Sequence, residues 1–122
     1  MIKTWGKQVF LAGGLALLGL VSQPLWAHAH LIDQVPAEGE VVAEPPEQLE
    51  LRFDSPIRIT QFEVHGPQGE IALSDGPVGE MGEHHEAVPA DVLAPGEYRV
   101  TWRGLAEDGH TMSGDFRFTV DD

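Results

Sequence analysis

The stretch "GEYRVTWRGLAEDGHTMSGDFRFTV", residues 96–120, decides the fold class of this chain. Apolar residues alternate with polar ones in its first and last parts: Tyr98, Val100 and Trp102, then Phe116, Phe118 and Val120. Alternation with a period of two is typical of β-strands that bury one face. Because the Asp108-Gly109 pair between the two runs favours a turn, the stretch predicts two core strands joined by a short connection.

The preceding sequence predicts more strands of the same kind. "LELRFD", residues 49–54, alternates in the same way. In "IRITQFEVHG", residues 57–66, the apolar positions change parity near Thr60 and Gln61, which predicts a bulge or bend there. No ten-residue window after Ala29 has the period of a helix. We therefore expect an all-β sandwich or barrel of about seven strands.

Residues 1–27 have the features of a cleaved secretory signal peptide. Lys3 and Lys7 precede the apolar run of residues 9–21, which is shorter than the roughly 20 apolar residues that span a bilayer. Cleavage after Ala27 makes His28 the first residue of the mature chain, whereas the A-x-A pattern of residues 27–29 favours a start at His30. The rules for such sites leave both starts open.

The charge and the absence of cysteine exclude several classes of function. All 20 acidic residues follow the leader, and only five of the seven basic residues do. Nucleic acids and anionic lipid surfaces are therefore poor partners for the mature domain, which we expect to be soluble. The chain has no cysteine, so it has neither disulfides nor thiolate metal ligands.

Histidine and carboxylate groups are the candidates for chemistry, because the chain has no motif of nucleophilic or phosphate-handling enzymes. Asp108 and His110 lie two residues apart in the predicted turn, where both side chains can point at one ion. An N-terminal histidine adds an amine and an imidazole. Nitrogen ligands with a carboxylate suit Cu(II) better than Ca²⁺ or Mg²⁺, which prefer oxygen.

Three segments together resemble the CopC family of copper-resistance proteins: "HAHLIDQVPAEG" (28–39), "LELRFDSPI" (49–57) and the stretch from residue 98 to residue 120. The resemblance implies an immunoglobulin-like, seven-stranded Greek-key β-barrel or sandwich over residues 28–122. It implies one Cu(II) per chain, bound by the amine and ring of His28, by Asp108 and by His110. It also implies a mature start at His28, export to the periplasm and a copper-handling partner, such as a CopD-like inner-membrane transporter or another copper-resistance protein.

The sequence departs from the family at the methionine-rich loop that binds Cu(I) in many members. Residues 74–96 contain only Met81, with His84 and His85. We interpret this segment as mobile polar loops with one weak strand near residues 86–88, and an accessory metal patch of these three residues is the alternative. His30 is expected to be a surface residue or an outer-shell partner of the copper ligands, and it is also a candidate accessory metal ligand.

These observations favour a non-enzymatic periplasmic carrier or buffer of Cu(II), acting in copper resistance and homeostasis. One alternative is an oxidative enzyme with copper in a histidine brace, although a carboxylate ligand would fill a position that oxygen chemistry needs. The other is a plain β-sandwich interaction module whose histidines are incidental.

Overall fold

The computed structural model describes residues 29–122, so the predicted signal peptide and His28 lie outside the described residues. These residues form eight strands: β1 (Leu31–Val35), β2 (Glu40–Val42), β3 (Leu49–Gly66), β4 (Gly69–Glu70), β5 (Leu73–Asp75), β6 (Met81–Pro89), β7 (Gly96–Ala106) and β8 (Thr111–Val120). The all-β prediction is confirmed, with eight strand segments where about seven were expected. Within residues 29–122, no helix is long and apolar enough to cross a membrane.

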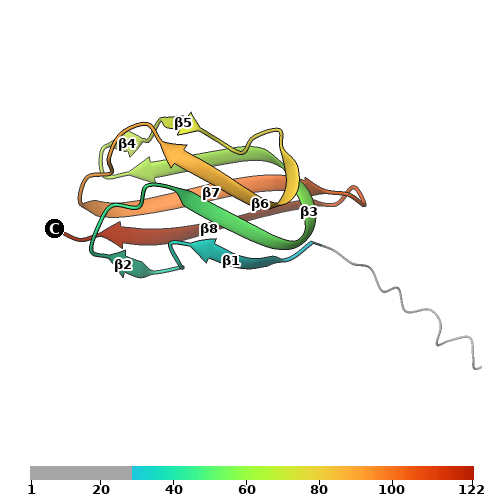
Figure 1. Cartoon of the computed structure of the whole chain (residues 1–122), viewed down its shortest axis with the longest axis horizontal. Helices are drawn as coiled ribbons and strands as arrows, with labels where there is room; N and C mark the ends of the chain where they lie inside the picture. Colours follow the sequence, from blue (N-terminus) through green and yellow to red (C-terminus); the bar gives the residue numbers. More distant parts are fainter. Residues whose placement is uncertain (1–28) are drawn as a thin grey trace, which may run out of the picture.

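Strand β3 connects the two layers of the sandwich (Figure 1). Its first part pairs with β1 and β6, and its second part pairs with β7, which continues to β8 and β2. The pairing of β3 with β6 shifts register between Arg52 and Ile57, and the pairing with β7 shifts between Ile59 and Gln61. The second shift confirms the bulge predicted at Thr60 and Gln61.

The bulge explains how both parities of β3 reach one core. Ile57 and Ile59 precede the shift, Phe62 and Val64 follow it, and all four side chains are buried. The predicted apolar faces of β7 and β8 are buried as well. Tyr98 of β7 adds a polar anchor, because its hydroxyl donates a hydrogen bond to the carbonyl of Ala94 at 2.5 Å. This resembles the tyrosine corner of immunoglobulin-like domains.

The interpretation of residues 74–96 as mobile loops with a weak strand near residues 86–88 was wrong. Met81–Pro89 forms the nine-residue strand β6, which pairs with β3 on one edge and with β5 on the other. Its buried positions are His85, Ala87 and Pro89; between them, His84 and Glu86 are exposed and polar, and Val88 is partly buried. The alternation is difficult to recognise in the sequence because a histidine, an alanine and a proline occupy the buried positions.

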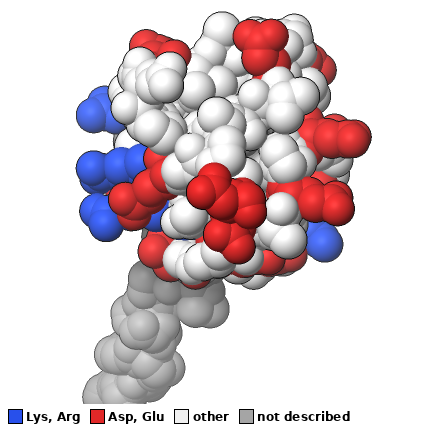
Figure 2. Space-filling view, turned by 90° about the vertical axis from the view of Figure 1, so that its left-hand side faces the viewer, with Lys and Arg blue, Asp and Glu red and all other residues white. Residues whose placement is uncertain are grey.

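Charge is unevenly distributed on the surface. Figure 2 shows Asp and Glu on most sides of one end of the sandwich, whereas most of the visible Lys and Arg gather on one side. On β7 and β8 the exposed cations are Arg99, Arg103 and Arg117. Arg99 lies opposite Arg117 in the sheet and pairs with Asp115 at 3.2 Å. The few cations of this acidic domain are thus concentrated on the β7–β8 face.

Candidate metal centre

The turn between β7 and β8 brings Asp108 and His110 together. One carboxylate oxygen of Asp108, Oδ1, accepts the backbone N–H of His110 at 3.0 Å, and the other, Oδ2, lies 3.0 Å from Nδ1 of the His110 ring. The turn is closed by hydrogen bonds from Gly109 to Ala106 and from Ala106 to His110, each 2.9 Å long. Gly109 has a φ of 91°, a conformation that favours glycine.

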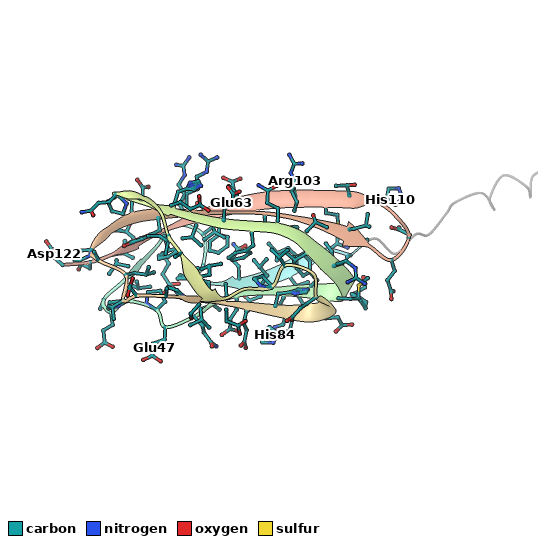
Figure 3. All side chains as sticks on the ribbon, turned by 90° about the horizontal axis from the view of Figure 1, so that it is seen from above. Glu47, Glu63, His84, Arg103, His110 and Asp122 are labelled. Carbon is teal, nitrogen blue, oxygen red and sulfur yellow. The ribbon has the colours of Figure 1, made fainter. Side chains whose placement is uncertain are left out.

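Both side chains of this pair are accessible to an ion. The His110 side chain is 63% exposed and the Asp108 side chain 28%. His110 projects from the end of the sandwich at which the described chain begins (Figure 3). The bend of β3 lies at the same end (Figure 1). The structure therefore places an imidazole and a carboxylate at the same end of the sandwich as Ala29, the first described residue.

The first described residues are held firmly at this end. Ala29 is only 1% exposed and belongs to the core. His30, by contrast, is exposed and is bound to Asp54 of β3. The backbone N–H of His30 donates to Oδ1 of Asp54 at 2.6 Å, and its ring Nδ1 lies 3.2 Å from Oδ2. The backbone hydrogen bond is the main cause that lowers the pKa of Asp54 below its usual value.

His85 does not belong to an accessory metal patch, and this prediction is corrected. Its side chain is buried, with only 2% exposed. Its Nε2 donates to the carbonyls of Ile57 at 3.0 Å and Gly82 at 2.9 Å, and its ring packs edge-on against Phe53. The histidine thus bridges the backbone where β3 and β6 shift register, and a surface ion cannot reach it.

The neighbouring residue His84 faces the solvent in a different environment. Its Nε2 lies 3.1 Å from a carboxylate oxygen of Glu50 and 3.7 Å from one of Glu86. Met81 is exposed at the start of β6, opposite Arg58. Sequence reasoning missed both glutamates. Glu86 lies two residues from His84 in the same strand, a spacing that places both side chains on one face and could have been recognised. Only the β3–β6 register brings Glu50 beside them.

The comparison with protein families identifies the chain. Residues 31–121 match the family model of the CopC domain. The chain belongs to the CopC family. Protein YobA of Escherichia coli strain K12 is 35% identical over 112 residues, which are 87% of this chain and 90% of that protein. The copper transport protein CutJ of Bacillus subtilis is 27% identical over 117 residues, which cover 87% of this chain but only 21% of that protein.

A crystal structure supports the same assignment. PcoC, described as a methionine-rich copper resistance protein from Escherichia coli, superposes with a TM-score of 0.64 and 28% identity, covering 78% of this chain and all of that chain. The predicted family is thus confirmed, and its function in copper resistance agrees with the predicted one. In contrast to a methionine-rich relative, this chain has only three methionines, one of them Met1.

Proposed function

We propose that this CopC-family protein carries or buffers Cu(II) in the periplasm, holds one ion tightly per chain, and acts without catalysing a reaction. The observation that supports this proposal is the Asp108–His110 pair, preformed at the end of the sandwich where the described chain starts. Two ligands in a closed turn lose little conformational freedom when they bind an ion.

The full ligand set is the amine and ring of His28, a carboxylate oxygen of Asp108 and the ring of His110. His28 directly precedes Ala29 in the sequence, and the core holds Ala29 in place. The nitrogen-rich set with a single carboxylate suits tetragonal Cu(II). Because Cu(II) is the cargo, the protein needs only to hold and release it.

A second chelate competes for the same amine. In a mature chain that begins His28-Ala29-His30, Cu(II) can displace two backbone amide protons and bind the amine, both amide nitrogens and the ring of His30. The amide nitrogen and Nδ1 of His30 are the two atoms bound by Asp54. We infer that this contact favours the folded site at neutral pH and makes His30 an outer-shell residue.

The recipient or donor of copper is a membrane copper transporter or another copper-resistance protein in this proposal. The similarity to CutJ supports the first choice, because there a segment resembling this chain makes up a fifth of a longer copper transport protein. The presence of a CopC-like segment and a longer remainder in one copper transport protein is consistent with transfer of copper between such a segment and a transporter.

Mass spectrometry of the exported protein tests the proposal directly. Titration with Cu(II) under native conditions is expected to show a mature chain that begins at His28 and retains one tightly bound ion after buffer exchange. A chain that begins at His30, or one that retains no copper, would contradict the assignment. Incubation of the copper-bound protein with peroxide and a polysaccharide should yield no oxidised product, whereas the oxidative enzyme would produce one.

A further inference from the structure

A second group of metal-ligating side chains lies on the outer face of the β3–β6 pair, on another side of the sandwich from His110 (Figure 3). It consists of Glu50, His84 and Glu86, whose ligand atoms all lie within 4.8 Å of one another. All three side chains are accessible, with 30% of Glu50 and 46% each of His84 and Glu86 exposed. We call them the β3–β6 cluster.

The distances in the β3–β6 cluster suit a shared ion. Ligand atoms about 2.1 Å from a Zn(II) or Cu(II) ion, at angles between 90° and tetrahedral, lie about 3.0–3.5 Å from one another. The Nε2 atom of His84 lies 3.1 Å from Glu50 Oε1 and 3.7 Å from Glu86 Oε2. The carboxylate oxygens of Glu50 and Glu86 lie within 4.8 Å of each other, so rotation of these exposed side chains would bring all three ligand atoms to one ion.

The register of the strands places two like charges directly opposite each other in this cluster. Glu50 of β3 is the cross-strand partner of Glu86 of β6, and like charges in such pairs are destabilising. The Nε2 atom of His84 lies 3.1 Å from an oxygen of one carboxylate and 3.7 Å from an oxygen of the other. A divalent cation neutralises both carboxylates, which a neutral imidazole cannot do, so the cluster has an electrostatic reason to bind one.

One ligand is already oriented. The side-chain amide of Gln48 donates to Oε2 of Glu50 at 3.0 Å, so Oε1 is left towards His84. Partners of this kind fix the direction of a metal-ligating carboxylate. The Gln48 hydrogen bond is also the largest cause that lowers the pKa of Glu50, ahead of the hydrogen bond with His84. The Glu50 carboxylate is therefore in its ligand form at neutral pH.

We propose that Glu50, His84 and Glu86 form a second, weaker site for a divalent cation of the Zn(II) or Cu(II) class. One imidazole and two carboxylates match the three protein ligands of an open Zn(II) site, with water in the remaining position. Any site of this kind prefers Cu(II) to Zn(II). In a copper-binding protein, it takes ions when the tight site is filled. The site uses none of the proposed ligands of the tight site, so it does not depend on the proposed function.

Titration of the isotope-labelled mature protein with Zn(II), followed by NMR, tests the site. The backbone amides of Glu50, His84 and Glu86 are expected to shift saturably. In a His84→Ala variant the same shifts should need at least tenfold more Zn(II), whereas the response of the Asp108–His110 turn should not change. Glu86→Gln, which keeps the side-chain size, should weaken binding several-fold. A second equivalent of Cu(II) should broaden the same amides after the tight site is filled.

His65→Ala is the matched control. His65 is an exposed histidine of β3 that lies 3.5 Å from Glu63 Oε1, but it does not belong to the three-ligand cluster. Its removal should leave the titration of β3 and β6 unchanged. Absence of saturable shifts at the cluster up to about 1 mM Zn(II), which is weak binding by any measure, would overturn the proposal, as would a His84→Ala protein that titrates like the wild type. Failure of the proposed tight copper site would appear separately, as the absence of a response of the Asp108–His110 turn to the first equivalent of Cu(II).

Discussion

The two carboxylate oxygens of Asp54 bind the backbone N–H and the ring Nδ1 of His30. A third hydrogen bond runs from the backbone N–H of Asp54 to the carbonyl of His30 at 3.0 Å. The first two contacts involve the atoms that an N-terminal copper chelate would use. A carboxylate that accepts the amide proton of His30 also opposes the loss of that proton. We therefore expect Asp54 to influence which of the two proposed copper complexes forms.

Asp54→Ala should therefore allow the amide-bound complex to form at a lower pH than in the wild type. The absorption band of the amide-bound complex lies at shorter wavelength than that of the folded site, because four nitrogen ligands replace a mixed set of nitrogen and oxygen ligands. The lowered pKa of Asp54 keeps its carboxylate charged at neutral pH, so the contact is lost only when pH falls below the usual carboxyl range. Visible spectra of the one-to-one copper complex across neutral and alkaline pH measure this shift. Asp33→Ala, at an exposed position of β1, is the control; identical spectra for Asp54→Ala and wild type would contradict the role of Asp54.

His110→Ala should weaken tight Cu(II) binding by more than the about 10–100-fold typical of an outer-shell residue, because a direct ligand is lost. His30→Ala, which removes a proposed outer-shell residue, should weaken binding at neutral pH by no more than that range. Competition with a chelator of known Cu(II) affinity measures both. Binding by either protein should weaken in acid, since amine and imidazole groups must be unprotonated to bind. Loss of tight binding in His30→Ala together with full binding in His110→Ala would show that the N-terminal tail binds copper by itself.

Cu(I) should be held weakly. It prefers thioether sulfur, but Met112 packs against the core and Met81 stands alone at the start of β6. Reduction of the copper-bound protein should release the metal to a Cu(I)-selective chelator, and Met81→Leu should release it equally. Retention of Cu(I) against the chelator by the wild-type protein would reveal a soft site that these residues do not explain.

The consecutive histidines of β6 should differ sharply in their effect on stability. His85→Ala removes a buried ring and leaves the carbonyls of Ile57 and Gly82 without their donor, which should cost about 2–4 kcal/mol. His84→Ala removes an exposed side chain and should change the free energy of unfolding by less than about 1 kcal/mol. Urea unfolding of both variants measures the difference. Equal losses would mean that the burial of His85 contributes little, and tight copper binding should survive in folded His85→Ala protein.

Tyr98 offers an optical test of the core, because it is the only tyrosine in the chain. Burial raises its pKa above the usual value of 10.0. Its ultraviolet titration should have a midpoint above that value in the folded protein and near it in denaturant. Since the folded pKa is raised, this contribution to stability is complete below about pH 10 and is lost as pH rises through the folded pKa. A titration identical in both states would contradict the burial of the phenol, and Tyr98→Phe provides the blank.

The sequence alone determined the elements whose chemistry is local. The alternating runs in β7 and β8 predicted both strands because side chains of a strand point to opposite faces in turn. The change of parity at Thr60 predicted the bulge of β3. Asp108 and His110 were found because a turn of two residues brings them together without help from the rest of the fold.

The tertiary structure decided what depends on pairing between distant segments. His84 and His85 are adjacent and chemically identical in the sequence, yet one is exposed beside two carboxylates and the other is buried. Their fates follow from the register of β6 against β3, because a shift of one residue would exchange the two faces. The same register brings Glu50 to Glu86 across 36 residues. No local sequence pattern predicts the pairing of Glu50 with Glu86. The pairing results from the way β3 bends from one layer of the sandwich into the other.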